Sequence, residues 1–293
     1  MAGWRSHLLV LCSLALAAGA AGCGSSEEVS DEELFGKKAG PPSGPSVIAG
    51  RFDAGGHKLY LECRGARSPT VVYLHGSVKV RGAGGGRNAG QVATRLDGDH
   101  RVCVYDRANV GRSDSMPGPL TGESSAKDLH ALLASADVRG PYVLLGASLG
   151  GAIADIYAAA YPADVAGMVL LDSTLPPYLG MYKRLFPPGS GPQPGEWKGE
   201  AERLDRLTTF RQAGKVQGHK PKIPVTYIGI KSLLSPRITA VIRRAQRAFV
   251  DRFSPGRLIV LDVPHSMESV VPERIAKEVE RVIALAKRPA SAR

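Results

Sequence analysis

One short stretch constrains the fold of this chain more than any other: an apolar run that stops at a serine between glycines. Residues 142–145 have the composition of a buried strand, residues 153–160 have that of a helix, and Gly-Ala-Ser148-Leu-Gly lies between them. A serine in a sharp strand-to-helix turn has a cramped backbone, which requires small neighbours. The spacing therefore indicates a nucleophilic Ser148. The alternative is an ordinary glycine-rich turn, in a chain with 35 glycines.

Apolar runs alternate with amphipathic segments along the rest of the chain. From residue 70 onward the runs are apolar throughout, which is typical of a mainly parallel sheet covered by helices on both faces. The first two runs flank residues 53–56 and are expected to form a hairpin. With 293 residues, 43% of them hydrophobic, we expect one α/β domain. The expected strands are residues 47–52, 58–63, 70–74, 102–105, 142–145, 167–171, 225–230 and 258–263, and the expected helices are residues 126–134, 152–160, 238–249 and 273–286.

The N-terminal residues differ in composition from the rest. Arg5 precedes the apolar run 8–16, which is typical of an export signal and is too short for a membrane span of about 20 residues. The small residues before Cys23 resemble a bacterial lipobox. We therefore expect a signal at residues 1–22 and a lipid on Cys23 that anchors the protein at the outer face of a bacterial membrane, or else a secreted protein. Residues 23–45 are expected to form a flexible tether to a domain at 46–293.

Five segments match a known family: they are PTVVYLHG (69–76), RVCVYDRANVGRSD (101–114), GPYVLLGASLGG (140–151), YPADVAGMVLLDS (161–173) and VPHSMESVVPERI (263–275). They resemble the α/β-hydrolase superfamily, in particular its secreted bacterial members. The resemblance runs from residue 47 to the C-terminus and implies a mostly parallel eight-stranded sheet with a small lid insert at residues 173–222. It also implies a serine hydrolase that cleaves a carboxylic ester through an acyl-enzyme intermediate, without a cofactor. Ala147 stands where histidine is common, and residues 82–86 are glycine-rich where tryptophan is common.

The resemblance places the base and the acid after the serine in the chain. His219 and His265 are then the candidate bases. His265 follows the last expected strand, at the carboxyl edge of the sheet where the serine lies, and is the predicted base. The family commonly places its acid after the strand 225–230, but this chain has Lys231 there. Asp172 ends the strand 167–171 at the same edge and is the predicted acid.

Other aspartates after the serine are less well placed. Asp155 lies about 10 Å down the helix that follows the serine. Asp164 precedes its strand and so lies at the opposite edge. Asp262 falls within the last expected strand, too close to His265 in the chain to curl back to its ring.

The resemblance also assigns the groups that stabilise the oxyanion formed by attack. They are the backbone amides of Leu149, after the nucleophile, and of Ser77, in the loop after the third expected strand. Gly76 permits this loop to approach the serine closely.

Cysteine usage agrees with export. Cys12 lies in the signal, so with Cys23 lipidated the exported domain keeps Cys63 and Cys103. Since the second and fourth strands are neighbours in this fold, the resemblance implies a disulfide between them. The alternative is two buried thiols.

The composition of the insert indicates which substrates the protein could accept. It is rich in proline, with one short helix expected near residues 200–211, and its apolar side chains suit a hydrophobic ester. Their packing onto the sheet is the alternative explanation. A peptidase or amidase would need a site for a substrate amine, which glutamates 196, 200 and 202 offer. A third hypothesis, beside the esterase and the peptidase or amidase, is a non-catalytic envelope protein, because no carboxylate follows the strand 225–230. The predicted pocket residues are Met181, Tyr182 and Phe186.

Charge and motifs exclude other classes. The formal net charge of +11 suits an anionic cell envelope, and the basic residues lie mainly on helix faces, so no nucleic-acid partner is expected. Residues 82–86 lack the spacing and lysine of a phosphate-binding loop, and no residue cluster has metal-ligand spacing. Epoxide hydrolases and dehalogenases need aspartate at the position of Ser148. Asp106 and Arg107 are expected to form a local ion pair.

Overall fold

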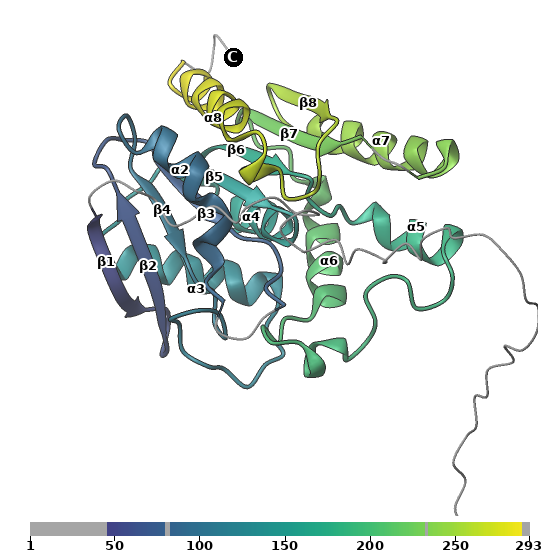
Figure 1. The fold of residues 1–293 in the computed structure, drawn as a ribbon, viewed down its shortest axis with the longest axis horizontal. Coiled ribbons are helices and arrows are strands. Elements are labelled where there is room, and N and C mark those ends of the chain that lie inside the picture. The colour runs from purple at the N-terminus through teal and green to yellow at the C-terminus, as the bar shows by residue number, and fades with distance from the viewer. Residues whose placement is uncertain (1–45, 80–82, 232–233, 289–293) are drawn as a thin grey trace, which may run out of the picture.

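The computed structural model describes residues 46–79, 83–231 and 234–288, and Figure 1 shows one sheet with helices on both of its faces. The predicted signal at residues 1–22, Cys23 and the predicted tether at residues 23–45 lie outside the described residues. Within the described part of the chain, no helix is long and apolar enough to cross a bilayer.

The sheet has eight strands in the order β1-β2-β4-β3-β5-β6-β7-β8. β1 and β2 form the predicted antiparallel hairpin, β2 is also antiparallel to β4, and all later neighbours are parallel. The predicted fold class is confirmed, and the carboxyl ends of β3 and β5 to β8 meet at one edge. The strands are β1 (Ser46–Asp53), β2 (Lys58–Arg64), β3 (Thr70–Leu74), β4 (Val102–Tyr105), β5 (Tyr142–Ala147), β6 (Val165–Leu171), β7 (Val225–Ile230) and β8 (Gly256–Leu261).

Both faces of the sheet are buried, which explains why its inner strands are apolar throughout. On β5, Leu144 packs into the core on one face, whereas Val143 and Leu145 pack into the core on the other. Figure 1 shows α2 and α8 on the same side of the sheet. The helices of the first core are α3 (Gly122–Ser135), α4 (Leu149–Ala160), α5 (Pro177–Leu185), α6 (Arg206–Lys215) and α7 (Pro236–Val250), and those of the second are α2 (Gly90–Leu96) and α8 (Pro272–Ala286).

The insert between β6 and β7 differs from the prediction. It contains two helices, α5 (Pro177–Leu185) and α6 (Arg206–Lys215), rather than one at residues 200–211. Proline is well tolerated in the first turn of α5, where its missing N–H has no helical partner. α6 starts late because the Asp205 carboxylate accepts a hydrogen bond from the Thr208 amide at 2.9 Å and caps the helix there.

One further helix and the end of the last strand also differ from the prediction. The short helix α2 follows the glycine-rich stretch, whose composition gives no helical signal. β8 ends at Leu261, two residues before the predicted end, so Asp262 lies just beyond the strand rather than within it.

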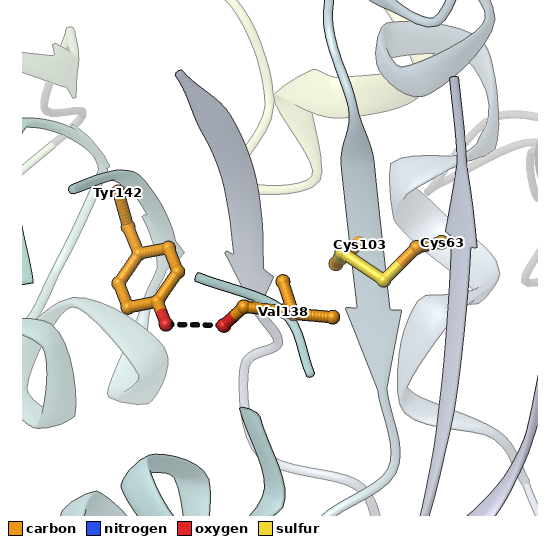
Figure 2. Close-up of a disulfide and its surroundings, with 4 residues drawn as sticks. All are labelled: Cys63, Cys103, Val138 and Tyr142. Atoms are coloured by element: carbon orange, nitrogen blue, oxygen red, sulfur yellow. Dashed lines mark hydrogen bonds between the residues drawn. A yellow bond between two sulfur atoms is a disulfide. The ribbon is translucent and has the colours of Figure 1, made fainter. Parts of the chain in front are cut away.

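A disulfide joins the hairpin to the parallel part of the sheet, as predicted (Figure 2). Cys63 on β2 is in register with Cys103 on β4, and their Cα atoms are 4.0 Å apart. Neither side chain is exposed to solvent. Nearby, the Tyr142 hydroxyl at the start of β5 donates a 2.6 Å hydrogen bond to the Val138 carbonyl. This bond ties β5 to the loop that leads into it.

We expect the double variant Cys63→Ala/Cys103→Ala to lose about 2–4 kcal/mol of unfolding free energy, because the bond closes a loop of sequence separation 40. Urea unfolding of the oxidised protein and of the variant measures the difference. Wild-type protein unfolded in the presence of a reductant should shift in the same direction. Two free thiols in the denatured, unreduced wild type would show that the bond does not form.

Candidate active site

Ser148 lies at a strained turn between β5 and α4. Its backbone has φ 49° and ψ −116°, a conformation that non-glycine residues rarely adopt. The turn is possible because its neighbours lack side chains: a Cβ on Gly150 would lie 2.0 Å from the Leu74 carbonyl oxygen, and one on Gly151 would lie 1.8 Å from the Ser173 hydroxyl. The strained backbone and the close packing of the two glycines therefore present the Ser148 side chain at this turn, as the G-x-S-x-G spacing predicts.

The predicted acid and base are in contact. His265 Nδ1 lies 2.6 Å from Asp172 Oδ2. This hydrogen bond is the main reason that the pKa of His265 is raised above its ordinary value of 6.5, against the opposing effect of burial. Ala147 and Leu171 are paired in register at the ends of β5 and β6, so Ser148 and Asp172 leave the sheet at the same level.

Ser148, Asp172 and His265 all line a cavity of about 830 Å³. Its other walls are mostly apolar and come from the insert, from α7 and from the segments that follow β7 and β8. The predicted pocket residues Met181, Tyr182 and Phe186 are among them, as are Tyr178, Ile230, Leu234, Ile242, Val263 and Pro264.

The predicted oxyanion residues lie on another side of the serine. Ser77 and Leu149 both line a second cavity of about 250 Å³, which Ser148 also borders. Gly76 brings the loop close, since a Cβ there would lie 3.3 Å from Ser148 Cβ. Leu149 opens α4, so its amide lies at the positive end of a helix dipole.

A buried ion pair holds the loop that carries Ser77. Arg107 Nε donates to Glu202 Oε1 at 2.5 Å, and each side chain is only 2% exposed. The same guanidinium donates to the carbonyls of His75 and Gly76, at 2.7 and 2.8 Å. Glu202 Oε2 accepts from the Val78 amide at 3.1 Å. The pair therefore fixes backbone groups on both sides of Ser77.

His75 supports the same loop as a neutral ring. Burial, with the positive charge of Arg107, holds the pKa of His75 well below its usual value. Its Nδ1 lies 2.8 Å from the Gly76 carbonyl, and the Arg107 amide donates to its Nε2 at 3.3 Å. A neutral ring with its proton on Nδ1 satisfies both bonds.

The expected ion pair of Asp106 with Arg107 is wrong. Asp106 instead accepts hydrogen bonds from the amides of Gly85 and Arg112, at 2.6 and 3.0 Å, and so orders the glycine-rich segment against the sheet. No pattern in the sequence indicates the true partner, Glu202, which lies 95 residues away.

The glutamates offered as an amine site are engaged elsewhere. Glu202 is buried against Arg107, while Glu196 and Glu200 both pair with Arg206, at 2.8 and 3.0 Å. Glu196 and Arg206 line the smaller cavity.

The other candidate acids and the other candidate base have separate partners. The buried Asp155 carboxylate bonds Arg252 at 2.9 and 3.1 Å. Asp262 pairs with Lys231 at 2.9 Å on the exposed rim of the large cavity. His219 accepts, through its backbone carbonyl, a hydrogen bond from Arg252 and does not line either cavity at Ser148.

Sequence reasoning missed one buried carboxyl near the predicted base. Glu268 lies in a 3-10 turn at Met267–Ser269 and is 3% exposed; the Tyr73 hydroxyl donates to its Oε1 at 2.9 Å. Burial raises the pKa of Glu268, and its charge adds to the raised pKa of His265. A glutamate in a polar segment after a strand has no sequence signature of burial. Its hydrogen bond anchors the segment that carries His265 to β3.

Comparison with known proteins identifies the family of the chain. The sequence model of the alpha/beta hydrolase fold family matches residues 69–222, and the chain belongs to this family. The chain is 36% identical to the uncharacterized protein YqjL of Bacillus subtilis over 80 residues, 27% of this chain and 32% of that protein. It is 34% identical to a proline iminopeptidase of Lactobacillus helveticus over 137 residues, 44% of each chain.

A solved esterase from Thermogutta terrifontis has the same fold, with a TM-score of 0.58, 17% sequence identity, and coverage of 83% of this chain and 100% of that one. The sequence matches named above span less than half of each relative's own length. The family and its relatives support a hydrolase.

We expect Glu202→Ala to lower the unfolding free energy by about 3–5 kcal/mol, because it leaves the Arg107 charge buried without its partner. Glu200→Ala on the same insert is the control. Its ion pair with Arg206 is about one-third exposed, so the loss should stay below about 1 kcal/mol. Urea unfolding compares them, and equal losses would contradict a special role for the buried pair.

Proposed function

We propose that the protein is a serine hydrolase that cleaves carboxylic esters, with Ser148 as nucleophile, His265 as base and Asp172 as acid. The observation that carries the proposal is the 2.6 Å contact between His265 Nδ1 and Asp172 Oδ2 beside a cavity that Ser148 also lines. The strained turn at Ser148 is the second support, since strain of this kind is concentrated at functional sites.

The acylation step follows from these groups. His265 Nε2 takes the proton of the Ser148 hydroxyl as its oxygen attacks the ester carbonyl carbon, and Asp172 stabilises the imidazolium that forms. The amides of Ser77 and Leu149 stabilise the negative charge on the former carbonyl oxygen. The intermediate then expels the alkoxide, which receives the proton from His265 and leaves as the alcohol. The acyl group remains on Ser148.

Deacylation repeats the sequence with water. His265 takes a proton from water as the hydroxide attacks the acyl carbon, and it then returns the proton to Ser148 Oγ as the carboxylic acid departs. Each step conserves protons between His265 and the reacting oxygens, so no cofactor is required.

Ester hydrolysis is favoured over cleavage of peptides with a free amino terminus. Such a peptidase needs an accessible carboxylate for the substrate amine. Glu202 is buried and bonded to Arg107, and both Glu196 and Glu200 are bonded to Arg206. The apolar walls of the large cavity suit an uncharged ester.

Ser148→Ala should abolish hydrolysis of p-nitrophenyl acetate and labelling by a fluorophosphonate while the variant stays folded, since the Ser148 side chain is small and partly exposed. Ser115→Ala, at an exposed loop serine, is the control and should keep both. Undiminished activity in the Ser148 variant would refute the proposal.

The pH profile tests the acid. His265 must be neutral to act as base, so kcat/KM should rise with pH through a pKa above 6.5 and level off on the alkaline side. In Asp172→Asn the main cause of the raised pKa is gone, so the acidic limb should move to lower pH while kcat falls by about 10³ to 10⁴. Asp262→Asn is the control, and its profile should match the wild type. A dead Asp262 variant would reassign the acid.

A further inference from the structure

Two cavities meet at the proposed nucleophile, and they differ in character. Ser148, Thr174 and Tyr182 line both of them. The large one, of about 830 Å³, is mostly apolar, whereas the small one, of about 250 Å³, is walled by polar and small residues. We call them the large lobe and the small lobe. The small lobe is lined by Ser77, Ser148, Leu149, Thr174, Tyr182, Gly189, Ser190, Gly191, Pro192, Glu196, Arg206 and Phe210.

One ion pair lines the small lobe. Arg206 bonds Glu196 at 2.8 Å, and it also bonds Glu200, which is not a lining residue, at 3.0 Å. Both Glu196 carboxylate oxygens are engaged, because Oε1 accepts from Arg206 and Oε2 accepts from the Gln193 amide at 3.0 Å. The charged groups of this wall therefore satisfy one another, so the lobe favours an uncharged group.

The position of His265 decides which lobe takes the alcohol part of the ester. His265 has to protonate the departing alkoxide, so the alcohol part of the ester must lie on the side of His265. His265 lines the large lobe and is not among the residues of the small lobe. Ser77 and Leu149, the proposed oxyanion donors, line the small lobe and not the large one. With the alcohol part in the large lobe, the acyl chain is left the other cavity that Ser148 borders, the small lobe.

The volumes of the two lobes agree with this assignment. At about 30 Å³ for a water-sized group, a volume of about 250 Å³ holds roughly eight such groups, and the large lobe holds more than three times as many. The small lobe therefore fits a short acyl group, and the large lobe fits an extended or ringed alcohol.

Resting on the function proposed above, we propose that the substrate is an ester of a large apolar alcohol with a short acyl group. The alcohol lies against Met181, Phe186 and Ile242 in the large lobe, and the acyl group lies in the small lobe.

An isomeric pair of esters tests the orientation. Octyl acetate and ethyl octanoate have the same atoms, with the long chain on the alcohol in one and on the acyl group in the other. We expect kcat/KM to be about tenfold or more higher for octyl acetate. Equal values, or a preference for ethyl octanoate, would overturn the assignment of the lobes.

A variant tests the wall of the large lobe. Ile242→Trp, which fills this lobe, should lower kcat/KM for octyl acetate about tenfold and affect ethyl acetate much less, whereas Ile238→Trp on the same helix but outside the lobe should change neither. An equal loss for octyl acetate and ethyl acetate in Ile242→Trp would overturn the role of the large lobe.

The failure of this assignment is distinguishable from the failure of the proposed function. Wild-type protein that hydrolyses p-nitrophenyl acetate and is labelled at Ser148, yet prefers ethyl octanoate, is a serine hydrolase with the lobes used the other way round. Wild-type protein that neither hydrolyses p-nitrophenyl acetate nor is labelled would overturn both.

Discussion

The buried pair of Arg107 and Glu202 is the interaction on which the site depends, because it connects parts of the molecule that the chain keeps far apart. Arg107 follows β4, Glu202 belongs to the insert after β6, and together they bond the backbone on both sides of Ser77. A buried ion pair contributes little net stability over an apolar pair, but losing one partner is costly. Its value here is geometric, since it fixes one stretch of the insert relative to the loop next to Ser148. The insert is therefore anchored to the sheet at this point rather than free to move as a separate flap.

A second constraint is the level at which the strands end. Ser148 and Asp172 both have positive φ, 49° and 37°, and each comes directly after a paired strand end. The Ser148 amide donates to the Leu171 carbonyl at 2.9 Å, and the Asp172 amide donates to the Ile228 carbonyl at 2.7 Å. Sheet pairing thus continues through the backbone of both residues while their side chains turn out of the sheet. Regular strand pairing sets the spacing between Ser148 and Asp172, and the strained backbone of each residue sets the direction of its side chain.

The sequence predicted the fold well because the signals of the sheet are local. β3, β4 and β7 begin and end where their apolar runs do, and the turn at Ser148 is written in consecutive small residues. The pairing of Asp172 with His265 was predicted from the resemblance to the α/β-hydrolase superfamily together with the rule that parallel strands share a carboxyl edge. What the sequence did not reveal depends on contacts between distant residues. The partner of Arg107 lies in the insert, and the burial of Glu268 depends on Tyr73, 195 residues away. The start of α6 at Arg206 depends on a cap that a propensity pattern does not resolve.

The place of the proposed acid follows from what occupies the end of the next strand. β6 lies directly beside β5, so a carboxylate at its end is one strand from Ser148, and His265 reaches it from the segment after β8. At the end of β7, where the family commonly has its acid, Lys231 stands and pairs with Asp262 at the rim of the large cavity. Ile230 and Leu261 are in register, which brings this cation and this carboxylate together just beyond the two strand ends. With Asp262 facing a cation on the exposed rim and Asp172 only 18% exposed beside the histidine, the two carboxylates have different environments at the same edge. Asp172 is the less exposed of the two, so water screens its charge less and it stabilises an imidazolium more strongly than Asp262 would.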